Sequence, residues 1–339
     1  MSKIKVGING FGRIGRLVLR SLLQYDKEGL FEVVATNSRT SPEQRAYMFK
    51  YDSVHRRYPG EVTYDDENII VNGKKIKVLS VMDIAKLPWK NLGVDIVIES
   101  TGKNTTAEEA SKHLEAGAKK VLISAPGKGD GVSTIVLGVN ENTYDPSKHN
   151  IISNASCTTN CLAPIVKVLN DEFGIEKGLM TTAHSYTNDQ KTLDSSHSKL
   201  HRGRAAAMSI IPTTTGAAKA IGIVIPEMKG KLNGLALRVP TPDVSVVDLV
   251  VESSKKVSAE EVNNAFKKHA EGDLSGYLSY ETGDLVSMDF VGDDHSAIFA
   301  APHTIVIDNM IKVLGWYDNE WGYSCRIVDL INYVIRKGL

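Results

Sequence analysis

The sequence predicts an α/β protein with two domains, a parallel sheet flanked by helices and then a domain of longer strands. With 339 residues, the chain is long for one hydrophobic core and suits two. Its first half alternates short apolar runs with helical patterns, which favours crossover connections and a parallel sheet. Past Asn150 the strands lengthen and this alternation ends, so we expect a domain boundary near that residue.

The elements of the first half follow the hydrophobic pattern. Pro42 stands near the first turn of its helix, and Asn72-Gly73 is a strong signal for a hairpin turn. Strands are predicted over residues 4–8, 31–36, 94–98 and 121–124, helices over 13–23, 42–49 and 106–115, and an alternating hairpin over 61–80.

The second half reads differently. A helix is predicted over residues 157–170, long strands over 178–184, 232–239, 245–252 and 304–317, and a terminal helix over 323–337. The polar stretch 185–204 is long for an unstructured connection, and loops of this length are usually functional or disordered.

Composition and charge exclude several classes of protein. Lys plus Arg (40) balances Asp plus Glu (40), so the overall charge does not point to nucleic acid or to an anionic membrane. No apolar run approaches the roughly 18 residues of a membrane span, and the first strand begins too early for a targeting peptide. Three cysteines are too few for a disulfide framework. We therefore expect a cytoplasmic protein with free thiols and no metal site.

A glycine motif between the first strand and the first helix predicts a dinucleotide site. Gly10, Gly12 and Gly15 form G-x-G-x-x-G in the strand–turn–helix context that the motif requires. Gly10 allows the tight turn, Gly12 lets the backbone approach a pyrophosphate, and Gly15 lets the helix pack on the sheet. The helix N-terminus then offers N–H groups to the phosphates. The alternative is a glycine-rich turn without a ligand.

The end of the second strand bears on which dinucleotide is bound. An NAD site usually has Asp or Glu there, to bind the ribose 2′-hydroxyl, but this chain has Asn37-Ser38-Arg39 and no carboxylate between Val33 and Pro42. A hydroxyl and a guanidinium suit a 2′-phosphate. Arg39 could equally be a solvated surface charge, and the position alone leaves both interpretations open.

A cysteine at a predicted helix start is the candidate nucleophile. Cys157 follows Ser156 and precedes Thr158, where the helix dipole and small hydroxyl groups favour a thiolate. The alternative is a small buried helix residue, and we assign that structural role to Cys161, one turn further on. His184 ends an apolar run and faces a polar loop, a suitable place for proton transfer. Any of the nine histidines could be the partner on this argument alone.

Together these motifs resemble the glyceraldehyde-3-phosphate dehydrogenase family, and the match runs over essentially the whole chain. The matching segments stand in the family's order. They are Gly10-Phe11-Gly12-Arg13-Ile14-Gly15-Arg16, Lys50-Tyr51-Asp52-Ser53, Ile123-Ser124-Ala125-Pro126, Ala155-Ser156-Cys157-Thr158-Thr159-Asn160-Cys161, His184-Ser185-Tyr186-Thr187, Gly216-Ala217-Ala218-Lys219-Ala220, Leu237-Arg238-Val239-Pro240 and Trp316-Tyr317-Asp318-Asn319-Glu320-Trp321-Gly322-Tyr323.

The resemblance implies the architecture and the reaction. A Rossmann dinucleotide-binding domain would cover residues 1–155, an α+β catalytic domain with a mostly antiparallel sheet 156–320, and a C-terminal helix over 321–339 would pack back on the first domain. The reaction would be the phosphorylating oxidation of D-glyceraldehyde 3-phosphate to 1,3-bisphosphoglycerate, and its reverse, through a thioester on Cys157 with His184 as base. The implied oligomer is a homotetramer.

The resemblance also implies the binding residues. Thr187, Asp189 and Arg238 would form the substrate-phosphate pocket, and Ser156, Thr158, Arg202, Thr215 and Gly216 the inorganic-phosphate pocket. The cofactor would contact Gly10, Phe11, Gly12, Arg13, Ile14, Ser38, Arg39, Ser124, Ser196, Asn319 and Tyr323, with Asn319 on the nicotinamide carboxamide.

Two departures from the common family pattern favour NADP over NAD. Ser38 stands where NAD-type members carry Asp, and Ser195-Ser196 replace a Leu-Pro pair that crowds a 2′-phosphate. We therefore expect NADP as the preferred cofactor, with NAD possible. Met82 stands where the family often has Arg near the adenine, and Arg56 where Gly is common. Arg56 adds positive charge nearby or is only a solvated surface residue.

Two other functions compete with this interpretation. Erythrose-4-phosphate dehydrogenases share the cysteine and histidine but hydrolyse the thioester, and the complete phosphate-pocket set, with Arg202 and Thr215, argues against that reaction. A regulatory or RNA-binding protein with a dormant site is the non-enzyme alternative. Neutral charge gives it little support, and we expect small-molecule partners, namely glyceraldehyde 3-phosphate and inorganic phosphate.

Overall fold

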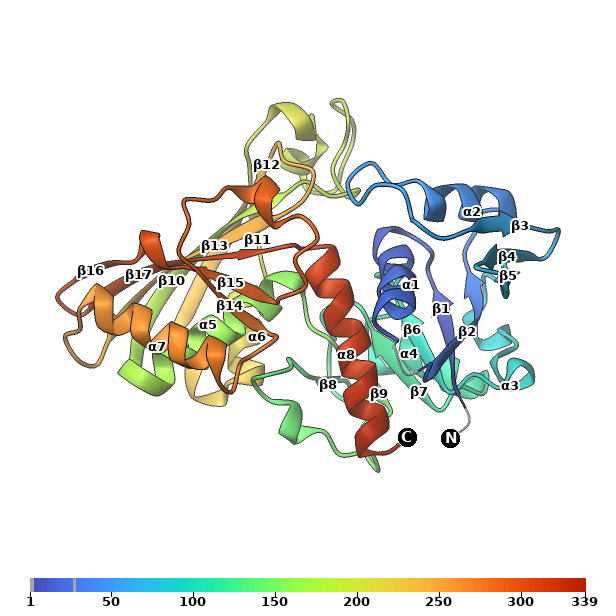
Figure 1. Ribbon diagram of the computed structural model, residues 1–339, viewed down its shortest axis with the longest axis horizontal. Helices are drawn as coiled ribbons and strands as arrows, with labels where there is room; N and C mark the ends of the chain where they lie inside the picture. The colour runs from blue at the N-terminus through green and yellow to red at the C-terminus, as the bar shows by residue number, and fades with distance from the viewer. Residues whose placement is uncertain (1–2, 27–28) are drawn as a thin grey trace. The chain divides into compact units, whose positions relative to one another are not determined.

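The computed structural model describes residues 3–26 and 29–339, which fall into two compact units (Figure 1). The first unit comprises Met1–Ile135, Asn142–Ala155 and Ser324–Leu339, and the second comprises Val136–Glu141 and Ser156–Tyr323. The C-terminal segment therefore belongs to the first unit although the second precedes it in the chain.

The first unit is built on a nine-stranded sheet whose core is parallel. The strand order is β3-β4-β5-β2-β1-β6-β7-β9-β8, and only the β3–β4 and β4–β5 pairs are antiparallel. The strands are β1 (Ile4–Asn9), β2 (Phe31–Asn37), β3 (Val62–Tyr64), β4 (Asn68–Val71), β5 (Lys74–Leu79), β6 (Ile96–Glu99), β7 (Lys120–Ile123), β8 (Ser133–Thr134) and β9 (Ile151–Ser153). Strand order reverses at β1, which lies between β2 and β6, and ligands of open α/β sheets bind at such a point.

Two of the helices in the first unit, α2 and α4, begin at local capping residues. They are α1 (Arg13–Tyr25), α2 (Pro42–Lys50), α3 (Trp89–Leu92), α4 (Ala107–Glu115) and α8 (Trp321–Lys337). Ser41 with Gln44, and Thr106 with Glu109, form capping boxes that satisfy the first N–H groups of α2 and α4. On α8, Cys325 lies 3.5 Å from the Ser21 hydroxyl.

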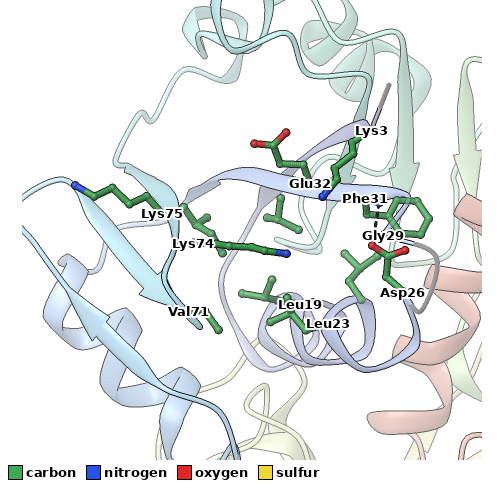
Figure 2. Close-up of a pocket in the computed structure, with 13 residues that line it drawn as sticks. Lys3, Leu19, Leu23, Asp26, Gly29, Phe31, Glu32, Val71, Lys74 and Lys75 are labelled. Atoms are coloured by element: carbon green, nitrogen blue, oxygen red, sulfur yellow. Dashed lines mark hydrogen bonds between the residues drawn. The ribbon is translucent and has the colours of Figure 1, made fainter. Parts of the chain in front are cut away.

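A pocket of about 530 Å³ lies between α1 and the β4–β5 hairpin (Figure 2). Its floor is apolar, with Leu19 and Leu23 from α1, and Lys74 reaches across it (Figure 2). The Asp26 carboxylate accepts hydrogen bonds from the N–H groups of Leu30 and Phe31. The Asp26 carboxylate therefore fixes the backbone at the start of β2.

The second unit is built on an eight-stranded, mostly antiparallel sheet, which confirms the predicted α+β architecture. The order is β11-β12-β10-β13-β17-β15-β14, with β16 paired to β17, and only β10–β12 and β14–β15 are parallel. The strands are β10 (Ile175–Ser185), β11 (Ile211–Thr214), β12 (Leu232–Val239), β13 (Ser245–Ser253), β14 (Leu278–Glu281), β15 (Ala297–Ala300), β16 (Ile305–Ile307) and β17 (Met310–Tyr317), and the helices are α5 (Cys157–Phe173), α6 (Ala217–Val224) and α7 (Ala259–Glu271).

Helix α5 packs closely on this sheet. A Cβ added at Gly315 would lie 2.3 Å from the Ile165 Cδ1 atom and 3.4 Å from the Cys161 sulfur. Cys161 is fully buried at this contact, and burial raises the pKa of its thiol. The structural role predicted for Cys161 is confirmed.

Most predicted elements are present, but one predicted strand is wrong. The segment 304–317 forms a hairpin of β16 and β17 instead of one strand. Asp308 between them has a φ of 55°, a left-handed conformation that turns the chain. At the predicted hairpin, Asn72 (φ 50°) and Gly73 (φ 76°) have the positive φ angles of a tight turn. The polar stretch 185–204 has little regular structure beyond a short 3-10 helix, Leu200–Gly203.

Within the part of the chain that the structure describes, no helix combines the length and the apolar character needed to cross a bilayer.

Candidate active site

The predicted nucleophile and the predicted base lie side by side in the second unit. Cys157 is the first residue of α5, and Ser156 caps that helix by accepting a hydrogen bond from the Thr159 N–H (3.0 Å). His184 is near the end of β10. The Cys157 Sγ and His184 Nε2 atoms are 3.6 Å apart, within the range of a hydrogen bond to sulfur. Cys157 is half-buried, so a small molecule can reach it.

Strand register brings Arg238 against the same histidine. The parallel β10 and β12 strands pair His184 with Arg238, and Arg238 Nη1 lies 2.6 Å from His184 Nδ1 and 2.9 Å from the Ser185 carbonyl oxygen. A guanidinium only donates hydrogen bonds, so Nδ1 accepts in this arrangement and the neutral ring carries its proton on Nε2. Nδ1 is also 2.8 Å from the Ser185 oxygen, which would accept Nδ1–H in the other tautomer.

Burial keeps this pair uncharged, and nearby arginines reinforce that effect at His184. Burial, followed by the charge of Arg238, lowers the pKa of His184 to about 3. Burial also raises the pKa of the Cys157 thiol, although Arg238 and hydrogen bonds from Thr158 oppose the rise. The predicted lowering of the thiol pKa by the helix dipole is therefore not what this arrangement produces, because desolvation outweighs the dipole. An anion near Arg238 would weaken its effect on His184.

Arg238 has the surroundings of an anion-binding residue. Its Nε atom is buried and has no hydrogen-bond partner among the described residues, and no carboxylate forms an ion pair with it there. Burial lowers its pKa, the Cys157 thiol opposes this, and Arg202 lowers it further. Buried cations and donors without partners are costly, and a phosphate would supply both the charge and the acceptors.

Arg202 and Asp189, two further residues of the predicted phosphate pockets, contact each other. Arg202 donates to the Asp189 carboxylate (2.6 Å) and to the Thr213 hydroxyl (3.0 Å). Asp189 also contacts His197 Nε2 (3.2 Å), so Arg202 and His197 each contact one oxygen of its carboxylate. Thr187 and Gln190 form a turn through the Thr187 N–H (3.2 Å). Thr213 was not predicted from the sequence.

The segment before α6 offers a further anion contact. The Thr215 hydroxyl accepts a hydrogen bond from the Ala217 N–H (3.2 Å). Gly216 is the N-cap of α6, has no side-chain cap, and has no atom within 4 Å of where a Cβ would be. Open space at an uncapped helix start is compatible with a phosphate.

Tyr317 supports the catalytic pair and was missed as a site residue. Its hydroxyl lies 2.9 Å from the Thr158 hydroxyl and 3.0 Å from that of Thr182, and its ring meets the His184 ring edge to face at 6.1 Å. Thr182 and His184 are two residues apart on β10 and therefore lie on the same face of the strand. This spacing could have indicated Thr182 as a site residue. Nothing in the local sequence indicates Tyr317, on β17.

Asn319 is held in one orientation by two serines. Its Oδ1 atom accepts hydrogen bonds from Ser185 (2.9 Å) and Ser245 (2.6 Å), while no described residue accepts from its Nδ2 group. The amide N–H₂ group is thus left to donate. Tyr323 is buried in the first turn of α8.

A buried acidic group lies next to this asparagine. Asp318 accepts hydrogen bonds from the N–H groups of Glu320, Trp321 and Gly292. Burial, with the charges of Asp318 and Glu320, raises the pKa of Asp243 well above its usual range. Asp243 is therefore protonated near neutral pH.

The glycine turn in the first unit has the geometry of a pyrophosphate site. Gly10 has a φ of 95°, and a Cβ there would lie 2.6 Å from the Ser100 backbone. A Cβ at Gly15 would be 2.1 Å from the Gly10 carbonyl oxygen, whereas one at Gly12 would meet nothing within 4 Å. Gly12 is the N-cap of α1 and provides no side-chain cap. Space and N–H groups are thus present where a phosphate would bind.

Two other predicted residues at this turn, Phe11 and Arg13, have side chains directed elsewhere. Phe11 is buried and stacks with Phe49 at 6.4 Å, and Arg13 forms an ion pair with Asp52. Phe11 and Arg13 could therefore contribute backbone groups to a cofactor. Ile14 is half-buried.

A pocket of about 310 Å³ at the carboxyl ends of β1, β2 and β6 contains two of the predicted determinants of cofactor choice, Ser38 and Arg39. Ser38, Arg39 and Met82 line it, and Arg56 does not. Its other lining residues are Asn9, Gly10, Asn37, Ser80, Val81, Asp83, Ile84, Thr101, Lys103, Asn104 and Lys112. Lys103, Lys112 and Arg39 outnumber the single acid Asp83, so the lining is cationic.

Arg56 has a separate explanation. Its φ is 62°, a left-handed conformation that glycine adopts without strain. This conformation explains why glycine is common at this position in the family. In this chain the Arg56 carbonyl accepts a hydrogen bond from Arg20 (3.1 Å), which stabilises the same backbone conformation.

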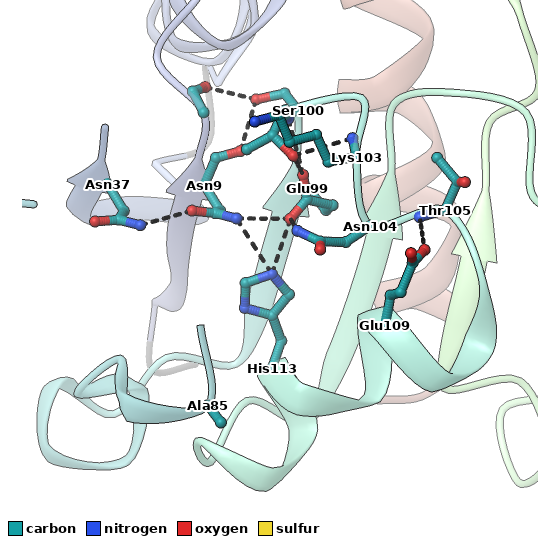
Figure 3. A network of polar contacts seen from close by, with 12 residues as sticks. Asn9, Asn37, Ala85, Glu99, Ser100, Lys103, Asn104, Thr105, Glu109 and His113 are labelled. Carbon is teal, nitrogen blue, oxygen red and sulfur yellow. Dashed lines mark hydrogen bonds and ion pairs between the residues drawn. The ribbon is translucent and has the colours of Figure 1, made fainter. Parts of the chain in front are cut away.

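The wall of the pocket is held by a buried hydrogen-bond network (Figure 3). Asn37 donates to Asn9 (2.8 Å), and Asn9 donates to the Glu99 carboxylate (2.6 Å). Glu99 lies 3.0 Å from His113 Nε2, whose ring accepts from the Trp89 indole at the other nitrogen (3.0 Å). Burial raises the pKa of Glu99, but hydrogen bonds led by His113 outweigh burial and lower it. The Glu99 charge is thus stabilised internally.

Ser124 and Ser196, also predicted to contact the cofactor, do not line this pocket. Ser124 follows β7, and its N–H donates to the Glu99 carbonyl (2.9 Å). Ser196 is exposed in the loop of the second unit, near the Ser195 N–H that donates to the Gly203 carbonyl (2.8 Å). The roles of both in cofactor binding remain predictions.

Comparison with known proteins agrees with these features. A family model described as the NAD binding domain of glyceraldehyde 3-phosphate dehydrogenase matches residues 4–107, and one described as its C-terminal domain matches residues 156–319. Glyceraldehyde-3-phosphate dehydrogenase of Geobacillus stearothermophilus is 59% identical over 99% of both chains. The enzyme of Priestia megaterium is 57% identical over 99% of both chains, and glyceraldehyde-3-phosphate dehydrogenase 2 of Trichormus variabilis is 55% identical over 98% of this chain and 99% of its own. The chain therefore belongs to the glyceraldehyde-3-phosphate dehydrogenase family.

Proposed function

We propose that this chain catalyses the phosphorylating oxidation of D-glyceraldehyde 3-phosphate with a preference for NADP over NAD. The dehydrogenase activity follows from family membership over the full chain. The observation that supports the chemistry is the 3.6 Å approach of Cys157 Sγ to His184 Nε2, beside an arginine without an acidic partner.

The covalent step uses the cysteine and the histidine. The Cys157 sulfur adds to the aldehyde carbon, its proton goes to His184 Nε2, and His184 passes this proton to the carbonyl oxygen to give a thiohemiacetal. When hydride leaves the carbon, the hydroxyl proton returns to His184 Nε2 and a thioester forms. For Nε2 to accept a proton, the neutral ring must carry its own proton on Nδ1, donated to the Ser185 oxygen. A phosphate that draws Arg238 away from Nδ1 makes this tautomer available.

The phosphates are assigned by charge. The substrate phosphate pairs with Arg238, and inorganic phosphate binds near Arg202, Thr215 and Gly216. Inorganic phosphate attacks the thioester carbon, the carbon–sulfur bond breaks, and the thiolate leaves with its charge stabilised by His184 and Arg238. The products are an acyl phosphate and free Cys157.

The nicotinamide dinucleotide supplies one piece of chemistry, acceptance of a hydride from the thiohemiacetal carbon. Gly10, Gly12 and the start of α1 would hold its pyrophosphate, and the oriented Nδ2 group of Asn319 would bind its carboxamide. Ser124, Ser196 and Tyr323 keep the cofactor contacts proposed from the sequence. The open space at Gly12 and the uncapped helix start fit this group.

The preference for NADP rests on the charge at the end of β2. Ser38 and Arg39 line the pocket where NAD sites present a carboxylate, and Lys103 and Lys112 add positive charge. An anionic 2′-phosphate gains from these groups, whereas a 2′-hydroxyl lacks the acid that usually accepts from it. We also expect a homotetramer in the cytoplasm, as in the family, which light scattering and cell fractionation would test.

Initial rates with NADP and NAD, each with and without inorganic phosphate, test the proposal. We expect kcat/KM to be at least tenfold higher with NADP and turnover to require phosphate. A rate indifferent to phosphate would indicate thioester hydrolysis, as in an erythrose-4-phosphate dehydrogenase. Equal or better turnover with NAD would contradict the cofactor assignment alone.

A further inference from the structure

Arg45, on α2, is a buried cation that neither the chemistry nor the sequence motifs explain. Its side chain is 0% exposed, and no carboxylate forms an ion pair with it among the described residues. Burial lowers its pKa to about 10, still far above neutral, so it is charged in the folded protein. A buried guanidinium without an acid is costly and calls for a compensating role.

Its guanidinium is directed entirely at backbone and threonine oxygens. Nη1 donates to the Thr36 carbonyl (2.7 Å) and hydroxyl (2.8 Å), and Nη2 donates to the carbonyls of Ser38 (2.7 Å) and Leu79 (2.6 Å). Nε lies 3.1 Å from the Thr40 carbonyl oxygen. These oxygens belong to the ends of β2 and β5 and to the loop that enters α2. Arg45 therefore determines the path of the loop that carries Ser38 and Arg39.

The direction of these carbonyls has a consequence for the pocket. In a trans peptide the C=O and the following N–H point in opposite directions, and the described chain has no cis peptides. Since the Ser38 and Leu79 carbonyls point at Arg45, the N–H groups of Arg39 and Ser80 point away from it. Ser38, Arg39 and Ser80 all line the cofactor pocket, so an anion bound beside these N–H groups would be favoured by the positive ends of the peptide dipoles.

The charges around the loop act in the same direction. Arg45 and Arg39 each place one positive charge near Ser38. Arg45 is buried and contacts the Ser38 carbonyl, whereas Arg39 is exposed and lines the pocket. The buried acid of the network in Figure 3, Glu99, accepts hydrogen bonds from Asn9, Thr101 and Asn104 and contacts His113. In a poorly solvated location the Arg45 charge is screened less than that of exposed Arg39.

We propose that Arg45 is a positioning residue for cofactor choice, which turns the end of β2 into a binding site for the 2′-phosphate of the adenosine ribose. This inference rests on the proposed preference for NADP and identifies what creates it. Ser38 and Arg39 make the contact, and Arg45 sets their backbone and the local potential.

Binding of two adenosine fragments tests this without turnover. Isothermal titration of the wild-type protein with adenosine 2′,5′-bisphosphate and with AMP gives a ratio of dissociation constants that isolates the 2′-phosphate. We expect Arg45→Met to reduce this ratio at least tenfold, and to reduce the NADP-to-NAD ratio of kcat/KM by a similar factor with kcat little changed.

Arg20→Met is the matched control. Arg20 is a second buried arginine of the first unit and also donates to carbonyls, those of Phe49, His55 and Arg56, but it does not line the pocket. We expect it to lower thermal stability as Arg45→Met does while leaving the fragment ratio within twofold of wild type. A ratio that falls equally in both variants would overturn the inference, since the effect would then be general loosening of the domain.

The outcomes separate the two proposals. If the wild-type ratio does not favour the 2′-phosphate, the NADP preference itself is wrong, and the inference falls with it. If the wild type favours it and Arg45→Met keeps that ratio, only the role of Arg45 is wrong. Should Arg45→Met not fold, Arg45→Lys retains the charge without the planar donor fork, and we expect a three- to tenfold loss, whereas an unchanged ratio would overturn the inference.

Discussion

Replacing Ser38 by aspartate should reverse the cofactor preference, from NADP to NAD. Ser38 lines the pocket at the end of β2, where a carboxylate would face the ribose 2′ position. Two unit charges about 5 Å apart repel by about 3 kcal/mol at an effective dielectric constant near 20.

The cations near this position reduce that repulsion. Arg39 lines the pocket, and Arg45 lies 2.7 Å from the Ser38 carbonyl oxygen, so a net loss of about 2 kcal/mol for NADP is reasonable. The carboxylate would also accept a hydrogen bond from the 2′-hydroxyl of NAD, worth about 1.5 kcal/mol. Together these terms amount to about 3.5 kcal/mol, or roughly a 300-fold fall in the NADP-to-NAD ratio.

The assay is initial-rate measurement of kcat/KM for both cofactors at saturating aldehyde and phosphate. Ser38→Asn is the control, because it has nearly the volume of aspartate without the charge, and we expect it to change the ratio by less than tenfold. A ratio within threefold of wild type for Ser38→Asp would refute the reasoning and place the determinant elsewhere.

Three further predictions follow from the second unit. Cys157→Ser should lower the oxidation rate at least about 1,000-fold with folding intact, because a hydroxyl is a far weaker nucleophile than a thiolate; stopped-flow detection of a normal burst would exclude Cys157 as the nucleophile. Arg238→Met should raise the pKa of His184, whose lowering by burial is reinforced by that arginine, and NMR titration of the imidazole should show protonation at higher pH; an unchanged titration would rule out the charge effect. Asp243 keeps its proton in the folded chain, so its stabilising contribution is complete below about pH 4 and is lost as pH rises toward the folded-state pKa. Asp243→Asn should therefore increase the free energy of unfolding by about 2 kcal/mol at pH 8 and less at pH 5, as measured by urea denaturation, and an equal effect at both pH values would contradict the raised pKa.

Local sequence determined the parts of this protein that depend on a few adjacent residues. The glycine turn requires the small side chains of Gly10 and Gly15 within one strand–helix junction. The starts of α2 and α4 follow from capping residues three positions apart. The place of Cys157 at a helix N-terminus follows from Ser156 beside it. The sequence indicates such features because their hydrogen bonds close within one turn of chain.

Tertiary structure decided which distant residues meet. Arg238 reaches His184 because β12 pairs in register with β10, and Tyr317 joins Thr158 and Thr182 because β17 lies beneath α5. Arg45 acts on Ser38 and Leu79 only once β2 and β5 are neighbours in the sheet. Strand order and register result from the packing of the whole sheet, so the ionisation of the catalytic pair and the charge behind the cofactor pocket could not be predicted from local patterns.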